Sequence, residues 1–109
     1  LATLNDVTYV EAARKFAERI LRSSSDSQVR LTFAFHTATG RHPSPREMAY
    51  LEASLAKYLQ TYTNHPDEAQ QLVSHGESPR DESLGSVELA AHTAVAGVLL
   101  NLDDTVTRN

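Results

Sequence analysis

The segment from Val87 to Leu102 constrains the fold more than any other part of the chain. Its apolar residues lie nearly all the way round the predicted helix rather than on one face. Such a helix is stable in water only when several neighbours cover it at once. Its four alanines and Gly97 permit close approach. We therefore predict a central helix near the end of the chain, enclosed by other helices.

The first of these helices is predicted from Thr8 to Arg22. Apolar residues recur every three or four positions, which is typical of one buried helix face. Thr8 and Glu11 fit a capping box, and Asp6 is the alternative cap. We expect the charged positions to face solvent; these are Glu11, Arg14, Lys15, Glu18, Arg19 and Arg22.

A second helix is predicted from Ser27 to Thr39, ending at Gly40, a residue that readily adopts the left-handed conformation of a helix terminus. The alternation Leu31-Phe33-Phe35 also suits a strand. Helix is the preferred interpretation, because no partner strand is predicted anywhere in the chain.

Two further helices begin at prolines. Ser44, Pro45 and Glu47 form a strong helix start, followed by apolar residues at helical spacing to Thr63. A short helix opens at Pro66 and ends near Ser74, and residues 77–85 form a polar loop before Ser86 caps the last helix.

Together these elements predict an all-α fold, a compact bundle of about five helices with the C-terminal apolar helix central. The 109 residues suffice for a single domain spanning 1–109. Eight residues are predicted to pack on the central helix: Val10, Phe16, Ile20, Phe33, Met48, Leu51, Leu55 and Leu59.

Composition excludes several classes of function. The chain has no cysteine, which removes disulfides, thiolate metal sites and thiol nucleophiles. No apolar stretch reaches the roughly 18 to 20 residues of a membrane span. A net charge of −4 gives no basic surface for nucleic acid. We expect no metal and no cofactor in this segment, since the five histidines lack metal-ligand spacing.

One candidate functional cluster lies near the end of the chain and comprises His92, Asn101, Asp103, Asp104 and Arg108. Its carboxylates and amide, predicted just past the helix terminus, are calcium-type ligands, but the glycine and final glutamate of an EF-hand loop are absent. The alternative is that Asp103 or Asp104 caps a turn or pairs with an arginine.

Two other features have both a functional and a structural interpretation. The turn from Gly40 to Pro45 carries Arg41 beside a helix N-terminus, which suits an anion, or is simply an interhelical turn. Tyr50, Tyr58 and Tyr62 form a stripe that is either a binding surface or part of the core.

Motifs at both ends of the chain resemble a known family. They are Leu4-Asn5-Asp6-Val7-Thr8-Tyr9-Val10-Glu11-Ala12-Ala13-Arg14 and Leu99-Leu100-Asn101-Leu102-Asp103-Asp104-Thr105-Val106-Thr107-Arg108, supported by internal stretches at 40–47, 76–81 and 88–91. The chain is similar to the C-terminal domain of unknown function of planctomycete-type secreted proteins, which often also carry cytochrome c domains. Val7 and Asp104 depart from that pattern, where proline and glutamate are usual.

The resemblance implies a C-terminal fragment of a larger exported protein, secreted or periplasmic, with association with carbohydrate processing and no established reaction. The leading hypothesis is a non-catalytic module that stabilises or docks the preceding domains of the same polypeptide. One alternative is that the segment supplies part of a hydrolytic or carbohydrate-active site completed by other domains. Another is ligand binding by the tyrosine stripe and the 77–85 loop.

Overall fold

The computed structural model describes residues 7–76 and 78–108, with the backbone alone described for residues 103–108. Five helices account for most of these residues, and no described residue lies in a strand. The helices are α1 (Val7–Ser23), α2 (Ser27–Thr39), α3 (Pro45–Asn64), α4 (Pro66–Val73) and α5 (Ser86–Arg108). The all-α prediction is confirmed, and the strand alternative for Leu31–Phe35 is wrong because that segment lies inside α2.

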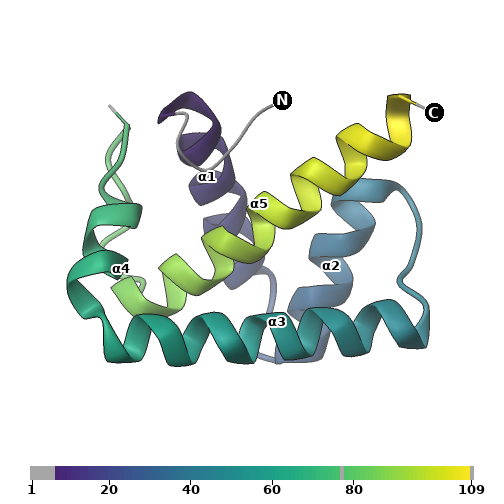
Figure 1. Cartoon of the computed structure of the whole chain (residues 1–109), viewed down its shortest axis with the longest axis horizontal. Coiled ribbons are helices and arrows are strands. Elements are labelled where there is room, and N and C mark those ends of the chain that lie inside the picture. Colours follow the sequence, from purple (N-terminus) through teal and green to yellow (C-terminus); the bar gives the residue numbers. More distant parts are fainter. Residues whose placement is uncertain (1–6, 77, 109) are drawn as a thin grey trace.

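Helix α5 is central, as predicted from its apolar circumference. It packs against all four other helices and crosses the middle of the molecule in Figure 1. Residues 89–97 are buried without interruption, and this run contains the four alanines and Gly97. The Tyr9 hydroxyl of α1 donates a hydrogen bond of 2.6 Å to the Gly97 carbonyl. Small side chains on α5 thus let its neighbours approach closely.

Local signals set the ends of the middle helices. Asp26 caps α2 through its side chain, and Gly40 closes the helix at φ +81°. Ser44 and Glu47 form the predicted capping box at the start of α3. The Thr8 capping box is wrong, because Thr8 lies within α1 and the Glu11 carboxylate binds a distant loop instead. The alternative cap, Asp6, lies outside the described residues.

Helix α5 extends six residues beyond the predicted end at Leu102 and reaches Arg108. Ser86, predicted as its cap, is its first residue. Asp103 and Asp104 consequently belong to the helix and do not follow its terminus. No helix in the described parts of the chain has the length and apolar character that crossing a membrane requires.

The predicted core is confirmed in its main members. Val10, Phe16, Ile20, Leu51 and Leu55 are buried. Three further predicted core residues, Phe33, Met48 and Leu59, are partly buried and pack against the same cluster.

Truncating a buried residue of α5 should destabilise the whole bundle. Leu89 is fully buried, so Leu89→Ala removes packing on several helices and should lower the free energy of unfolding by about 2–5 kcal/mol. Val29→Ala is the control, because Val29 is 50% exposed, and it should change that free energy by less than about 0.5 kcal/mol. Urea denaturation followed by circular dichroism measures both; equal effects would contradict the central position of α5.

Candidate functional site

His92, a member of the predicted cluster, is enclosed in the core. Its side chain is only 2% exposed. Nδ1 lies 2.8 Å from the Glu88 carbonyl oxygen, and a carbonyl only accepts, so Nδ1 carries the proton. Nε2 is buried without a hydrogen-bond partner. Burial lowers the pKa of His92, and the lowered pKa keeps the imidazole neutral. Burial also keeps the imidazole out of reach of a substrate.

The other members of the cluster lie further along α5 than His92. Asn101 is nine residues further along α5, which places it on the opposite face of the helix. Asp103 is eleven residues away, a rise of about 16 Å along the helix axis. The side chains of Asp103, Asp104 and Arg108 lie outside the described residues. The backbone positions of His92 and Asp103 are therefore about three helical turns apart.

An apolar groove opens on the other side of α5. Helices α3 and α5 lie close together at one end and diverge toward the C-terminal end of α5 (Figure 1). The groove occupies this wedge, with α2 as its floor, and has a volume of about 580 Å³. Its apolar lining comprises Phe35, Tyr50, Leu51, Val98, Leu99 and Leu102.

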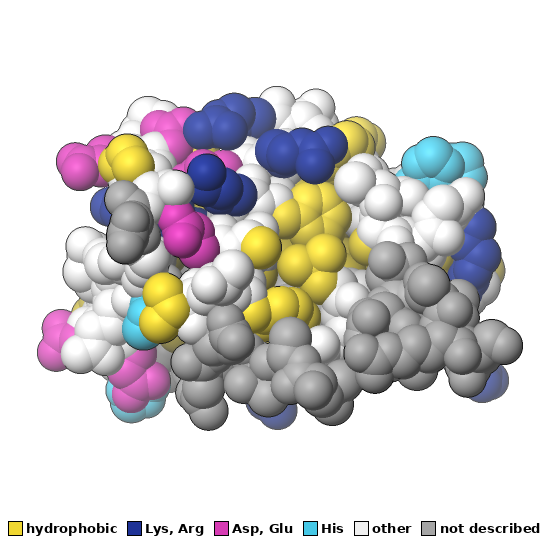
Figure 2. Space-filling view, turned by 90° about the horizontal axis from the view of Figure 1, so that it is seen from above, with side chains coloured by type: hydrophobic (Ala, Val, Ile, Leu, Met, Phe, Trp, Pro, Cys, Tyr) yellow, Lys and Arg dark blue, Asp and Glu magenta, His cyan; other side chains and the backbone are white. Residues whose placement is uncertain are grey.

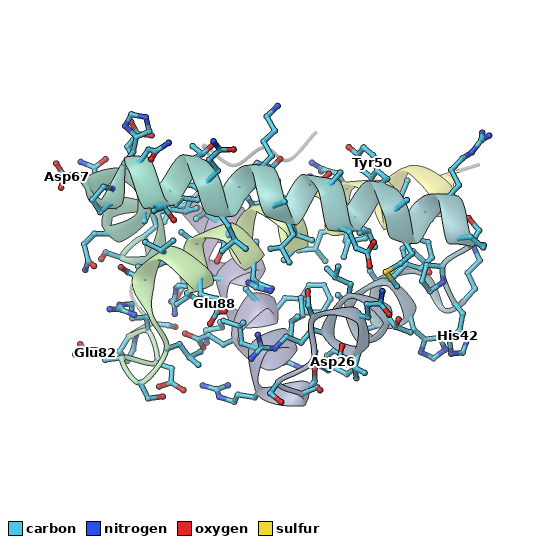
Figure 3. The ribbon with its side chains drawn as sticks, turned by 90° about the horizontal axis from the view of Figure 1, so that it is seen from below. Asp26, His42, Tyr50, Asp67, Glu82 and Glu88 are labelled. Carbon is cyan, nitrogen blue, oxygen red and sulfur yellow. The ribbon has the colours of Figure 1, made fainter. Side chains whose placement is uncertain are left out.

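Two of these groove residues are unusually exposed for apolar side chains. Tyr50 is 61% exposed and Leu102 is 39% exposed. Figure 3 shows Tyr50 on the outer side of α3. The polar rim of the groove contains Arg46, Glu47 and Asn101. An exposed apolar surface with a polar rim is typical of a binding site.

The two charged residues at the rim, Arg46 and Glu47, differ in whether they are already paired within the chain. Glu47 accepts two hydrogen bonds from Arg41, at 2.9 and 2.8 Å, and these bonds, together with one from the Ser44 N–H, lower the pKa of Glu47 to about 2. Arg46 forms no ion pair with any residue that the structure describes. Arg46 is therefore the cation that the groove offers to a ligand.

Among the side chains that the structure describes, the buried cation is Arg14, which sequence reasoning placed in solvent. The side chain is fully buried, and Glu18, also expected in solvent, is 8% exposed. Arg14 donates to Glu18 at 3.0 Å and to the carbonyl oxygens of Ser78, at 2.7 Å, and Pro79, at 3.5 Å. The loop after α4 covers the arginine and excludes water from it. We call Glu11, Arg14 and Glu18 the α1 charge network.

The carboxylates of the α1 charge network hold the same loop through its N–H groups. Glu11 accepts from the Ser78 N–H at 2.7 Å, and Glu18 accepts from the Asp81 N–H at 2.9 Å. Hydrogen bonds from Ser78 hold the pKa of Glu11 below its ordinary value. Gly76 adopts φ +90°, and a Cβ there would lie 2.6 Å from the Glu11 side chain. Glycine is therefore required where the loop meets α1.

Asp81 extends this attachment at the surface. Hydrogen bonds from Ser83, then from Arg22, lower the pKa of Asp81 to about 2. The Arg22 to Asp81 contact measures 2.5 Å, and the arginine side chain is 51% exposed. In the 77–85 loop, considered earlier as a ligand-binding segment, Ser78, Pro79 and Asp81 are thus engaged with α1.

The other candidate features take structural roles. Arg41 pairs with Glu47 and lies over the Phe35 ring, so the Gly40–Pro45 turn offers no free arginine for an anion. Tyr58 and Tyr62 pack against the core, whereas Tyr50 remains exposed. The described residues contain no group of three or more potential metal ligands. One juxtaposition was missed: the rings of His36 and His42, which belong to separate elements, lie 4.7 Å apart.

No protein-family model, curated protein or solved structure matches the chain.

Removing the buried arginine should be strongly destabilising. Arg14→Met keeps the aliphatic volume but leaves Glu18 and two loop carbonyls without their donor, so the free energy of unfolding should fall by about 3–5 kcal/mol. Lys15→Met is the matched control, because Lys15 is exposed on the same helix. Urea denaturation gives the loss, and limited proteolysis should show faster cleavage in the loop after α4. Equal stability of the two variants would show that the α1 charge network contributes nothing.

His92 should make stability depend on pH in the weakly acidic range. Its pKa is below 6.5 in the folded chain, so the unfolded chain binds more protons between that folded pKa and about 6.5. Stability is complete above about pH 6.5 and falls as the pH drops toward the folded pKa. His92→Leu should flatten this dependence in denaturation curves between about pH 5 and 7. His65→Leu, at an exposed site, should leave it unchanged.

Proposed function

We propose that this chain is a non-catalytic helical module that docks onto the preceding domains of a larger exported polypeptide. The observation that carries the proposal is the apolar groove between α2, α3 and α5. The larger polypeptide and its export rest on the resemblance to planctomycete-type secreted proteins, as does a role near carbohydrate processing.

The chemistry of the groove defines its occupant. Apolar lining residues and an exposed Tyr50 favour a segment with apolar anchoring side chains, as when an amphipathic helix binds in a hydrophobic groove. Because Glu47 is neutralised by Arg41, the rim presents the positive charge of Arg46. The occupant is therefore an apolar segment of the same polypeptide that carries a carboxylate opposite Arg46.

The buried polar groups support a structural role. Arg14, Glu18 and Glu11 direct their hydrogen bonds to the loop after α4, and His92 is enclosed. These are the groups that an active site would need to expose. The alternative, part of a hydrolytic or carbohydrate-active site, relies on Asp103, Asp104 and Arg108, whose side chains lie outside the described residues.

A charge placed in the groove should abolish docking. In the full-length parent, the double variant Tyr50→Asp, Leu102→Asp should undock the module, because burying two carboxylates among apolar side chains is costly. Hydrogen exchange at residues 46–51 and 98–102 should then be at least about tenfold faster than in the unmodified parent. Arg46→Glu should produce a smaller acceleration that depends on ionic strength.

The control is Val29→Asp, which places a carboxylate at a residue that is 50% exposed, on α2 and outside the groove. It should leave exchange at the groove unchanged. Unchanged exchange in the groove double variant would refute docking at this surface. A parent that retains its fold but loses an enzymatic activity on deletion of the module would favour the alternative function.

A further inference from the structure

His36 and His42 form a pair of imidazoles at one edge of the molecule. His36 lies in the last turn of α2, and Gly40 reverses the chain so that His42 returns beside it. The ring centroids are 4.7 Å apart and the ring planes are inclined by 34°. Histidine side chains form a patch at the edge of the face shown in Figure 2, and His42 is labelled at the periphery in Figure 3.

Both imidazoles are available to a ligand. The two residues are exposed, and neither ring takes part in a hydrogen bond or ion pair with any described residue. They border a hollow of about 420 Å³ whose other lining residues are Gln28, Val29, Thr32 and Phe33. Thr32 is one helical turn before His36, so its hydroxyl lies on the same face of α2.

The positive charge of the neighbouring Arg41 does not repel a cation bound by the two histidines. Arg41 lies between the two histidines in sequence, but its guanidinium is over the Phe35 ring and pairs with both oxygens of Glu47. The positive charge of Arg41 is thereby neutralised by Glu47. None of the described residues that line the hollow is a carboxylate, so hard cations such as Ca²⁺ and Mg²⁺ lack their preferred ligands among them.

The ring separation matches that of two imidazoles on one metal ion. With metal–nitrogen distances of about 2.0–2.1 Å and ligand angles of about 90–109°, the centroids of two such rings are about 4.5–5.2 Å apart. The observed 4.7 Å lies within this interval. Because both residues are exposed, their rings are free to turn about the side-chain bonds so that a nitrogen of each faces one shared ion.

We propose that His36 and His42 form a surface site for a divalent transition metal ion that prefers imidazole ligands, with Zn²⁺ as the representative. Water molecules complete the coordination sphere, so the site has positions open to exchange. The ion links the end of α2 to the turn that leads into α3. The inference does not depend on the proposed docking function, since it uses no residue of the apolar groove.

The test is calorimetric titration of the untagged chain with Zn²⁺ at pH 7. The chain should bind a single ion with an affinity that falls at least about tenfold in each of His36→Ala and His42→Ala, because one imidazole remains in each variant. The thermal midpoint should rise with Zn²⁺ in the unmodified chain and not in these variants.

His65→Ala and His75→Ala are the matched controls, since both residues are exposed histidines outside the pair. Both should bind Zn²⁺ as tightly as the unmodified chain. Circular dichroism should show the same helix content in all four variants, because each substitution is at the surface. Unchanged affinity in His36→Ala or His42→Ala, or an equal loss in the control variants, would overturn the proposal.

Discussion

The enclosure of α5 on all sides is the constraint on which the described structure depends. Each of the other four helices contacts it, and each contributes apolar side chains to the same core. Because α5 carries alanines and Gly97 where it is most buried, its small side chains leave room for the side chains of its neighbours. Larger side chains such as Phe16, Phe35 and Leu55 come from its neighbours and fill that space. The groove lies where α3 diverges from α5 and α5 is no longer enclosed.

Most of the fold could be predicted because its signals are local. Asp26, Gly40 and the Ser44–Glu47 pair mark helix ends within a few residues of their effects. Arg14 could not be placed in this way, because the loop that covers it lies 64 residues later in the chain. A weak signal was present: Val10 and Ala17 flank Arg14 at helical spacing, which puts the arginine at the border of the buried face.

The candidate surfaces were less predictable than the helices. The groove exists because α3 and α5 diverge, and an angle between helices distant in sequence depends on the packing of the whole core. The histidine pair likewise depends on how Gly40 turns the chain, although its φ of +81° is what a glycine there favours. His92, by contrast, was singled out for its chemistry, and its position within the apolar segment already favoured burial.

The attachment of the loop after α4 has a consequence for how its conformation is encoded. The α1 charge network binds the backbone carbonyl groups of Ser78 and Pro79 and the backbone N–H group of Ser78. Every residue type provides a carbonyl group, and every residue type except proline provides an N–H group. The side chain of Ser78 is therefore not the determinant of this contact. The information that fixes the backbone at these two positions resides in the α1 charge network, on a helix formed by a remote part of the chain. Sequence variation at positions 78 and 79 is therefore tolerable as long as those three residues and Gly76 are retained and position 78 keeps its N–H.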